Sequence, residues 1–222
     1  MTFNQLAVSY LIMFIAQTSA YGQETKQVTE PFPVLQERLR DARVTENRLS
    51  NGAVITEIQF AGSMQPNFDL DCISIAEVGS AFNPPALLHA AKKCITQGRY
   101  SNAWELLTTG LGFAYYDVKR LADRSTHGAR TVLMMKIFEN LTTEERETSQ
   151  KVSKEIQRNP EKVAAYCTEL KRIGPPTYEP KWIILHGIGV YDEPREGHYL
   201  KNVDANALWE EVLKNRCTPQ KG

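Results

Sequence analysis

The sequence predicts a mainly α protein: a helical bundle that follows a small N-terminal β element. Apolar residues recur at helical spacing through most of residues 83–217, which indicates amphipathic helices packed on one another. Asparagine–proline pairs at residues 83–84 and 159–160 are typical of helix starts. A β-branched, roughly alternating run over residues 53–60 predicts one strand. We therefore expect a signal peptide over residues 1–22, an N-terminal segment over 23–82 and a helical domain over 83–217.

The stretch from Asn83 to Leu111 predicts two antiparallel helices joined by a tight turn. The Asn83 side chain can accept a hydrogen bond from the free N–H groups of a helix start, and Pro84 fits a position where no N–H is needed. Gly98 can adopt the left-handed conformation that ends a helix. Because the turn is short, the apolar faces of the two helices should cover each other. Those faces carry Leu87, Ala91, Cys94 and Ile95, and then Tyr100, Ala103, Leu106, Leu107, Gly110, Leu111 and Ala114.

Within this stretch, eight residues occupy the large, small and aromatic packing positions of a helix–turn–helix repeat. They are Leu87, Ala90, Ala91, Cys94, Gly98, Tyr100, Ala103 and Leu107. On these residues, the stretch 87–110 resembles a single tetratricopeptide or Sel1-like repeat unit. Such repeats recur with a period of about 34 residues, and no second unit is visible at that spacing. The resemblance implies tetratricopeptide-like hairpin packing, and an ordinary helical hairpin within a bundle is the alternative.

The first 22 residues have the pattern of a secretory signal peptide. Residues 6–16 form an apolar run that is short for a membrane span, and small residues follow it. A small-x-small cleavage site ends at Gly22, and a second ends at Ala20. We expect a periplasmic or secreted protein with no integral membrane span after cleavage. An uncleaved anchor helix is the alternative.

Composition and motif searches argue against several classes of function. The chain carries 26 basic and 26 acidic residues, and broad nucleic-acid binding needs a basic surface. The four histidines form no HExxH or HxH pattern, and no glycine-rich phosphate loop is present. The sequence therefore predicts no nucleic-acid partner, no metal site and no cofactor.

Four cysteines in an exported chain indicate two disulfides. Cys94 and Cys167 lie on apolar helical faces, and Cys72 and Cys217 flank the helical region. From these positions we expect the pairs Cys94–Cys167 and Cys72–Cys217, although three connectivities are open.

The N-terminal segment predicts a short helix and a β element. Charged helix formers occupy residues 34–43, and an Asn-Gly turn signal at residues 51–52 precedes the strand. The best candidate for the partner strand is the stretch 70–75.

The later sequence predicts four more helices and one short helical turn. A continuous apolar stripe predicts a helix over residues 117–138. Thr142 and Glu145 have the spacing of a capping box for the next helix. Asn159 and Asp204 are expected to cap the helices that follow, and residues 182–185 to form one or two helical turns.

A polar cluster on the expected helix 117–138 gives the strongest catalytic candidates. Asp123, Arg124, His127 and Arg130 would share one side of that helix, and Asp123 could orient His127 for acid–base work. A solvated helix face with weak intrahelical pairs is the alternative. His186 begins a His-Gly-Ile-Gly stretch similar to the oxyanion loops of esterases, but the serine elbow of those enzymes is absent. The catalytic candidates are therefore Asp123, His127 and His186.

Aromatic and arginine side chains give the binding candidates, because such residues supply much of the energy of protein interfaces. The candidates are Trp104, Tyr115, Tyr116, Arg124, Trp182 and Tyr191. The alternative is that the aromatic side chains fill the core.

These observations favour a binding protein over an enzyme. The first hypothesis is an exported helical module that grips a protein partner, such as an immunity or inhibitor protein or an envelope adaptor. The second is a hydrolase or metal-dependent enzyme that uses Asp123 and His127 with His186 or His198. Imidazoles that converge in one cleft would favour the enzyme.

Overall fold

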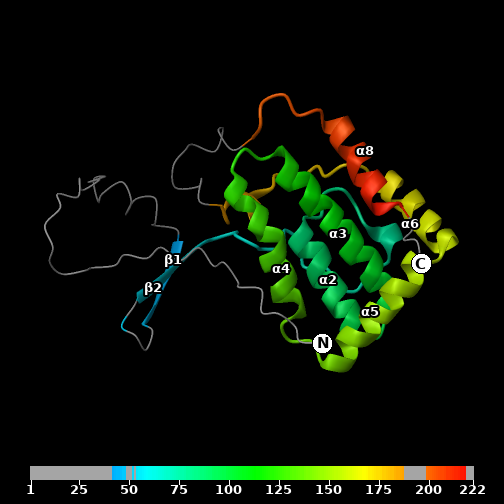
Figure 1. Ribbon diagram of the computed structural model, residues 1–222, viewed down its shortest axis with the longest axis horizontal. Coiled ribbons are helices and arrows are strands. Elements are labelled where there is room, and N and C mark those ends of the chain that lie inside the picture. The colour runs from blue at the N-terminus through cyan, green and yellow to red at the C-terminus, as the bar shows by residue number, and fades with distance from the viewer. Residues whose placement is uncertain (1–41, 49–51, 53, 188–198, 219–222) are drawn as a thin grey trace, which may run out of the picture. The chain divides into compact units, whose positions relative to one another are not determined.

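The computed structural model describes residues 42–48, 52, 54–187 and 199–218. The chain divides into two units, residues 1–61 and residues 62–222 (Figure 1). The expected signal peptide, residues 34–41 of the expected short helix, and the candidates Tyr191 and His198 lie outside the described residues.

The first unit contains an antiparallel hairpin of β1 (Ala42–Arg48) and β2 (Val54–Phe60). Its register pairs Ala42 with Phe60 and Arg48 with Val54. The predicted strand is confirmed, but its predicted partner, the stretch 70–75, is wrong. The partner is β1, which precedes β2 directly along the chain, and Gly52 between them has a φ of +84°. Because segments close in the sequence close only a short loop when they pair, this pairing costs less chain entropy than one with a distant segment.

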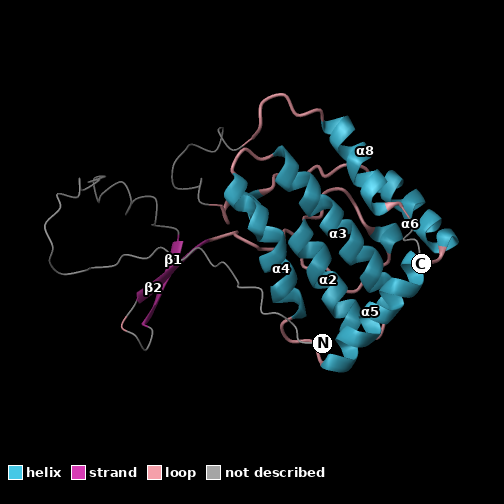
Figure 2. Ribbon diagram, in the orientation of Figure 1, coloured by secondary structure: helices cyan, strands magenta, loops and turns pink. Residues whose placement is uncertain are grey.

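The second unit is helical, which confirms the mainly α class (Figure 2). Its described α-helices are α2 (Pro84–Thr96), α3 (Tyr100–Arg120), α4 (Ala129–Phe138), α5 (Thr143–Gln157), α6 (Pro160–Ile173), α7 (Lys181–Ile184) and α8 (Ala205–Arg216). Two 3₁₀ helices, η1 (Ile75–Glu77) and η2 (Arg124–Gly128), complete it. Among the described helices, none has both the length and the apolar character that crossing a bilayer requires.

The predicted helix starts are confirmed by their caps. The Asn83 side chain accepts a 3.0 Å hydrogen bond from the backbone N–H of Ala86. The Thr142 hydroxyl and the Glu145 carboxylate form the expected capping box. Asn159 and Asp204 each accept two backbone N–H groups at the starts of α6 and α8. These side chains satisfy N–H groups that have no partner inside a helix.

Helices α2 and α3 form the central antiparallel hairpin, joined where Gly98 has a φ of +73°. At Gly110 the two helices approach so closely that a Cβ atom would lie 2.2 Å from Cδ1 of Leu88 and 3.2 Å from Cβ of Leu87. Helix α3 also packs against α5 and α8, and α2 packs against α4. Side chains of the hairpin therefore contribute to both apolar cores of the unit.

The continuous helix expected over residues 117–138 is wrong. Helix α3 ends at Arg120, and Leu121 is extended and forms a β-bridge with Tyr199. The Asp123 carboxylate then accepts the backbone N–H of Ser125 and caps η2, so the chain restarts before α4. A local cap and a long-range bridge thus override the apolar periodicity of this stretch.

All four cysteines are in disulfides, but the expected pairing is wrong. The bonds join Cys72 to Cys94 and Cys167 to Cys217, with Cα–Cα distances of 4.8 and 5.6 Å. The first bond ties the segment before α2 to that helix, and the second ties the end of α8 to α6. Cys94 on α2 and Cys167 on α6 lie on apolar helical faces, as expected. Each bonds a cysteine outside the two helices, at position 72 or 217, and they do not bond each other.

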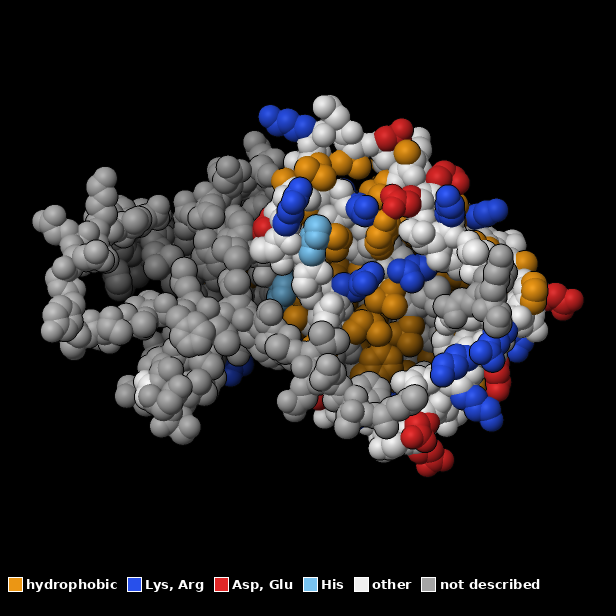
Figure 3. Space-filling view, viewed as in Figure 1, with side chains coloured by type: hydrophobic (Ala, Val, Ile, Leu, Met, Phe, Trp, Pro, Cys, Tyr) orange, Lys and Arg blue, Asp and Glu red, His pale blue; other side chains and the backbone are white. Residues whose placement is uncertain are grey.

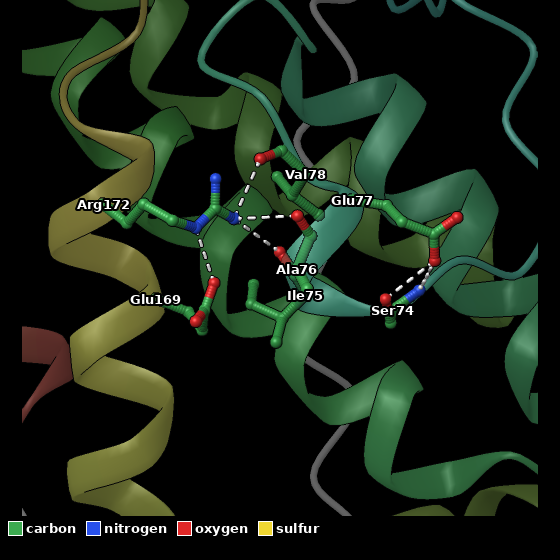
Figure 4. Close-up of polar contacts among 7 residues, drawn as sticks. All are labelled: Ser74, Ile75, Ala76, Glu77, Val78, Glu169 and Arg172. Atoms are coloured by element: carbon green, nitrogen blue, oxygen red, sulfur yellow. Dashed lines mark hydrogen bonds and ion pairs between the residues drawn. The ribbon is translucent and has the colours of Figure 1, made fainter.

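Residues 62–82, expected in the N-terminal segment, belong to the helical unit. Arg172 on α6 fixes part of this segment (Figure 4). Its Nη2 atom donates to the carbonyl oxygens of Ile75, Ala76 and Val78 at 3.1, 3.1 and 3.4 Å. Its Nε atom donates to Glu169 at 2.7 Å. One side chain thus donates to three carbonyl groups of the segment 75–78 and ties that segment to α6.

Candidate binding site

The catalytic candidates are not assembled into a reactive group in the described part of the chain. Asp123 binds the backbone and the hydroxyl of Ser125 as a cap, at 2.8 and 2.6 Å. His127 is exposed on η2. Gly187 packs against Asp123 closely, since a Cβ there would lie 2.2 Å from the Asp123 Oδ2 atom. The fold therefore brings the residue after His186 to Asp123, in an arrangement that spacing along one helix did not predict.

The three described histidines lie on separate elements. His89 is on α2, His127 is on η2, and His186 follows α7. The side chain of none of the three forms a hydrogen bond or ion pair within the described residues. Burial and the charges of neighbouring lysines lower the pKa of His89 and of His186. Within the described ranges, no group of three metal-ligating side chains converges.

Three of the aromatic binding candidates are buried. Trp104, Tyr116 and Trp182 are 7%, 5% and 1% exposed. These three side chains therefore fill the core, which was the alternative to a binding role. Trp104 packs edge-on against Tyr166 at 4.9 Å. Tyr115 is half-buried and its hydroxyl donates to Glu211, while Arg124 is exposed.

A buried polar network surrounds Asp117 on α3. Its carboxylate accepts hydrogen bonds from Arg120 at 2.7 Å, from the Tyr178 hydroxyl at 2.8 Å and from the Trp182 indole at 2.7 Å. Burial, partly offset by these donors, raises the pKa of Asp117 to about 6. The network joins α3 to the segment that contains α7, and its carboxylate is fully buried. We therefore assign it to the architecture of the unit.

A hollow of about 570 Å³ lies among the described residues. Apolar side chains from α3, α4 and the start of α6 line it: Trp104, Leu107, Leu111, Met134, Phe138 and Val163. Figure 3, in the orientation of Figure 1, shows hydrophobic side chains gathered in a hollow over α3, with Lys and Arg side chains beside it. A hollow of this size and lining is typical of ligand sites and of pockets that receive anchor side chains.

Polar side chains line the opposite wall. One face of α5 contributes Arg146, Ser149, Gln150, Ser153 and Gln157, which follow each other at helical spacing. Thr108 on α3 and residues Asn215, Arg216 and Thr218 at the end of α8 complete the lining. The hydroxyl and amide groups can donate or accept hydrogen bonds, and the two cations are arginines. No carboxylate is among the described residues that line the hollow.

The hollow is held in shape before any ligand arrives. Cys217 stands between the lining residues Arg216 and Thr218 in the sequence, and its disulfide with Cys167 ties this wall to α6. On the opposite side, Arg146 donates two hydrogen bonds to the Leu141 carbonyl at 2.9 and 2.6 Å and so ties α5 to the loop after α4. Such fixed walls reduce the entropy cost of binding.

Apart from Trp104, the residues of this hollow were not among the sequence candidates. The available signal was the polar face of α5, where small hydroxyl and amide side chains recur every three or four residues. A helix that only faces solvent usually carries charged side chains on its polar face. On α5, serine and glutamine occupy one stripe of that face instead. The contributions from α4 and α8 depend on tertiary packing and had no local signal.

Comparison with known proteins does not place the chain in a family. No protein-family model, curated protein or solved structure matches it.

Proposed function

We propose that this chain is an exported binding module whose helical unit holds a protein partner at the hollow between α3, α4, α5 and the end of α8. The observation that carries this proposal is the hollow itself: a fixed, apolar-floored site of about 570 Å³ with hydroxyl and amide groups along one wall. Large apolar anchors of a partner would desolvate on the floor, and the polar wall would orient them.

Two further observations support binding over catalysis and export over a cytosolic setting. His127 and His186 lack hydrogen-bonded acid or base partners within the described residues, so the acid–base geometry of the alternative enzyme is not supported there. Both disulfides favour an oxidising compartment, because such bonds are rare in the cytosol. An immunity or inhibitor protein, or an envelope adaptor, would have these properties.

The test is to block the hollow without changing the rest of the surface. In Ser149→Trp, a large ring replaces a half-buried serine of the lining. Lys151→Trp makes the same addition at an exposed position of α5, on the other side of the helix. Each variant is immobilised, challenged with envelope extract from the source cells, and the retained proteins are quantified by mass spectrometry.

We expect one partner that wild type and Lys151→Trp retain equally and that Ser149→Trp loses by about tenfold or more, a change equivalent to about 1.4 kcal/mol. Equal retention by Ser149→Trp would place the interface elsewhere. Failure of all three proteins to retain any partner would overturn the proposal.

A further inference from the structure

Arg216, the last residue of α8, is a partly buried cation without a carboxylate partner. Its Nη2 atom donates to the Leu111 carbonyl at 3.2 Å, and this is its one hydrogen bond within the described residues. No ion pair involves Arg216 among those residues. A guanidinium has five N–H donors, so most of those of Arg216, which lines the hollow, have no acceptor among the described residues.

The surroundings of Arg216 add positive charge and do not neutralise it. Burial lowers the pKa of Arg216, and the charge of Arg130 lowers it further, while the phenols of Tyr166 and Tyr115 act in the opposite direction. Arg130 is not itself a lining residue, but it lies one helical turn before Met134 on α4, and Met134 lines the hollow. Arg130 is exposed and has no hydrogen bond or ion pair in the described part of the chain. Two neighbouring cations without a counter-charge form a site for an anion.

The third arginine near the hollow has a different role. The Arg146 side chain donates all of its hydrogen bonds to the carbonyl oxygens of Glu139 and Leu141, just after the C-terminal end of α4. The Nε and Nη2 donors of its guanidinium are therefore already bonded to backbone carbonyl groups. The cationic end of the hollow therefore has Arg216 in its lining and Arg130 one helical turn from the lining residue Met134, while the floor is apolar.

We propose that the partner presents an acidic segment, in which an Asp or Glu carboxylate enters between Arg130 and Arg216 and a neighbouring large apolar side chain rests on the floor. This inference rests on the proposed function and adds the chemistry of the partner. Charge complementarity selects the carboxylate, because no carboxylate lines the hollow among the described residues. The apolar floor favours a large apolar side chain next to that carboxylate, because a carboxylate alone would leave the floor exposed to water.

The experiment selects peptides from a random 12-residue phage library on three proteins. They are the wild type, the double variant Arg130→Gln/Arg216→Gln, and the control Lys171→Gln/Lys214→Gln. The control removes the same charge from exposed lysines of α6 and α8 that do not line the hollow. Selected peptides are then synthesised with Asp or with Asn at the acidic position, and their affinities are measured by calorimetry.

Wild type and control should enrich peptides with Asp or Glu within two positions of Leu, Phe or Trp. The arginine double variant should lose the acidic preference and bind the synthetic peptide about tenfold or more weakly, and the Asn peptide should bind wild type equally weakly. Thermal unfolding of each protein shows whether it is folded. If the double variant is not, Arg130→Gln alone, which removes no described bond, is compared with Lys171→Gln.

The other outcomes separate the two proposals. Peptides enriched on the apolar floor without acidic preference would leave the proposed function standing and overturn this inference. No enrichment on wild type would count against both. Arginine-dependent sedimentation with phosphatidylglycerol vesicles, without acidic peptides in the selection, would identify a lipid headgroup as the anion and overturn the protein-segment assignment.

Discussion

The Trp182 indole donates a 2.7 Å hydrogen bond to Oδ2 of Asp117, a carboxylate that solvent does not reach. This bond links α7 to the middle of the unit through the last turn of α3. Tyr178 donates to the same oxygen at 2.8 Å, and Arg120 pairs with Oδ1 at 2.7 Å. A carboxylate with three donors is well satisfied, yet its burial still penalises the charged form.

This network predicts a pH dependence of stability that Asp117→Asn should remove. Burial raises the pKa of Asp117 from 3.8 to about 6, so the folded state binds a proton more tightly than the unfolded state. The contribution of this group to the free energy of unfolding should therefore fall by about 3 kcal/mol in total as the pH rises from about 4 to about 6. Above that pH it should stay constant. Urea unfolding of both proteins across this range measures the difference. A wild-type advantage that grows with pH would contradict the prediction.

The two disulfides should contribute unequally to stability. Their cysteines are 22 and 50 residues apart, and loop-closure entropy predicts losses of about 3 and about 4 kcal/mol for Cys72→Ser/Cys94→Ser and Cys167→Ser/Cys217→Ser. Urea unfolding of each double variant gives the two values. Non-reducing peptide mapping of the wild type should recover the pairs 72–94 and 167–217. Recovery of a Cys94–Cys167 peptide would refute the structure here.

Gly110→Ala should destabilise the central hairpin although alanine is the better helix former. The added Cβ would lie 3.2 Å from the Leu87 Cβ and 2.2 Å from a Leu88 methyl group, so the α2–α3 contact must widen. Overpacking of this kind costs about 1–3 kcal/mol. Gly128→Ala, just before α4, is the control, because Gly128 has a φ of −70° and nothing lies within 4 Å of an added Cβ. Thermal unfolding should show a loss for Gly110→Ala and a change near zero or a small gain for Gly128→Ala.

Arg172→Ala should release η1 from α6. The variant removes a charge-assisted donor shared by three carbonyl groups and the pair with Glu169. We expect a loss of about 1–3 kcal/mol and faster hydrogen exchange at the Val78 N–H, which bonds the Ile75 carbonyl. Arg172→Lys should recover little, because an ammonium lacks the planar fork. Lys171→Ala, at an exposed neighbouring position, should leave both measurements unchanged.

The sequence by itself determined the helical class and the helix starts. Caps such as Asn83 and Thr142 act within three residues of themselves, and apolar periodicity over one helix is likewise local. The strand over residues 54–60 could be predicted for the same reason.

Tertiary structure alone decided the break at Leu121, the disulfide partners and the hollow. Leu121 is extended because Tyr199 pairs with it across the fold, and Cys94 bonds Cys72 because the segment before α2 folds back on that helix. Arg216 on α8 donates to the Leu111 carbonyl of α3, 105 positions earlier in the chain. Each of these depends on which segments share space, and the spacing of residues within one helix or strand carries no information about contacts between separate segments.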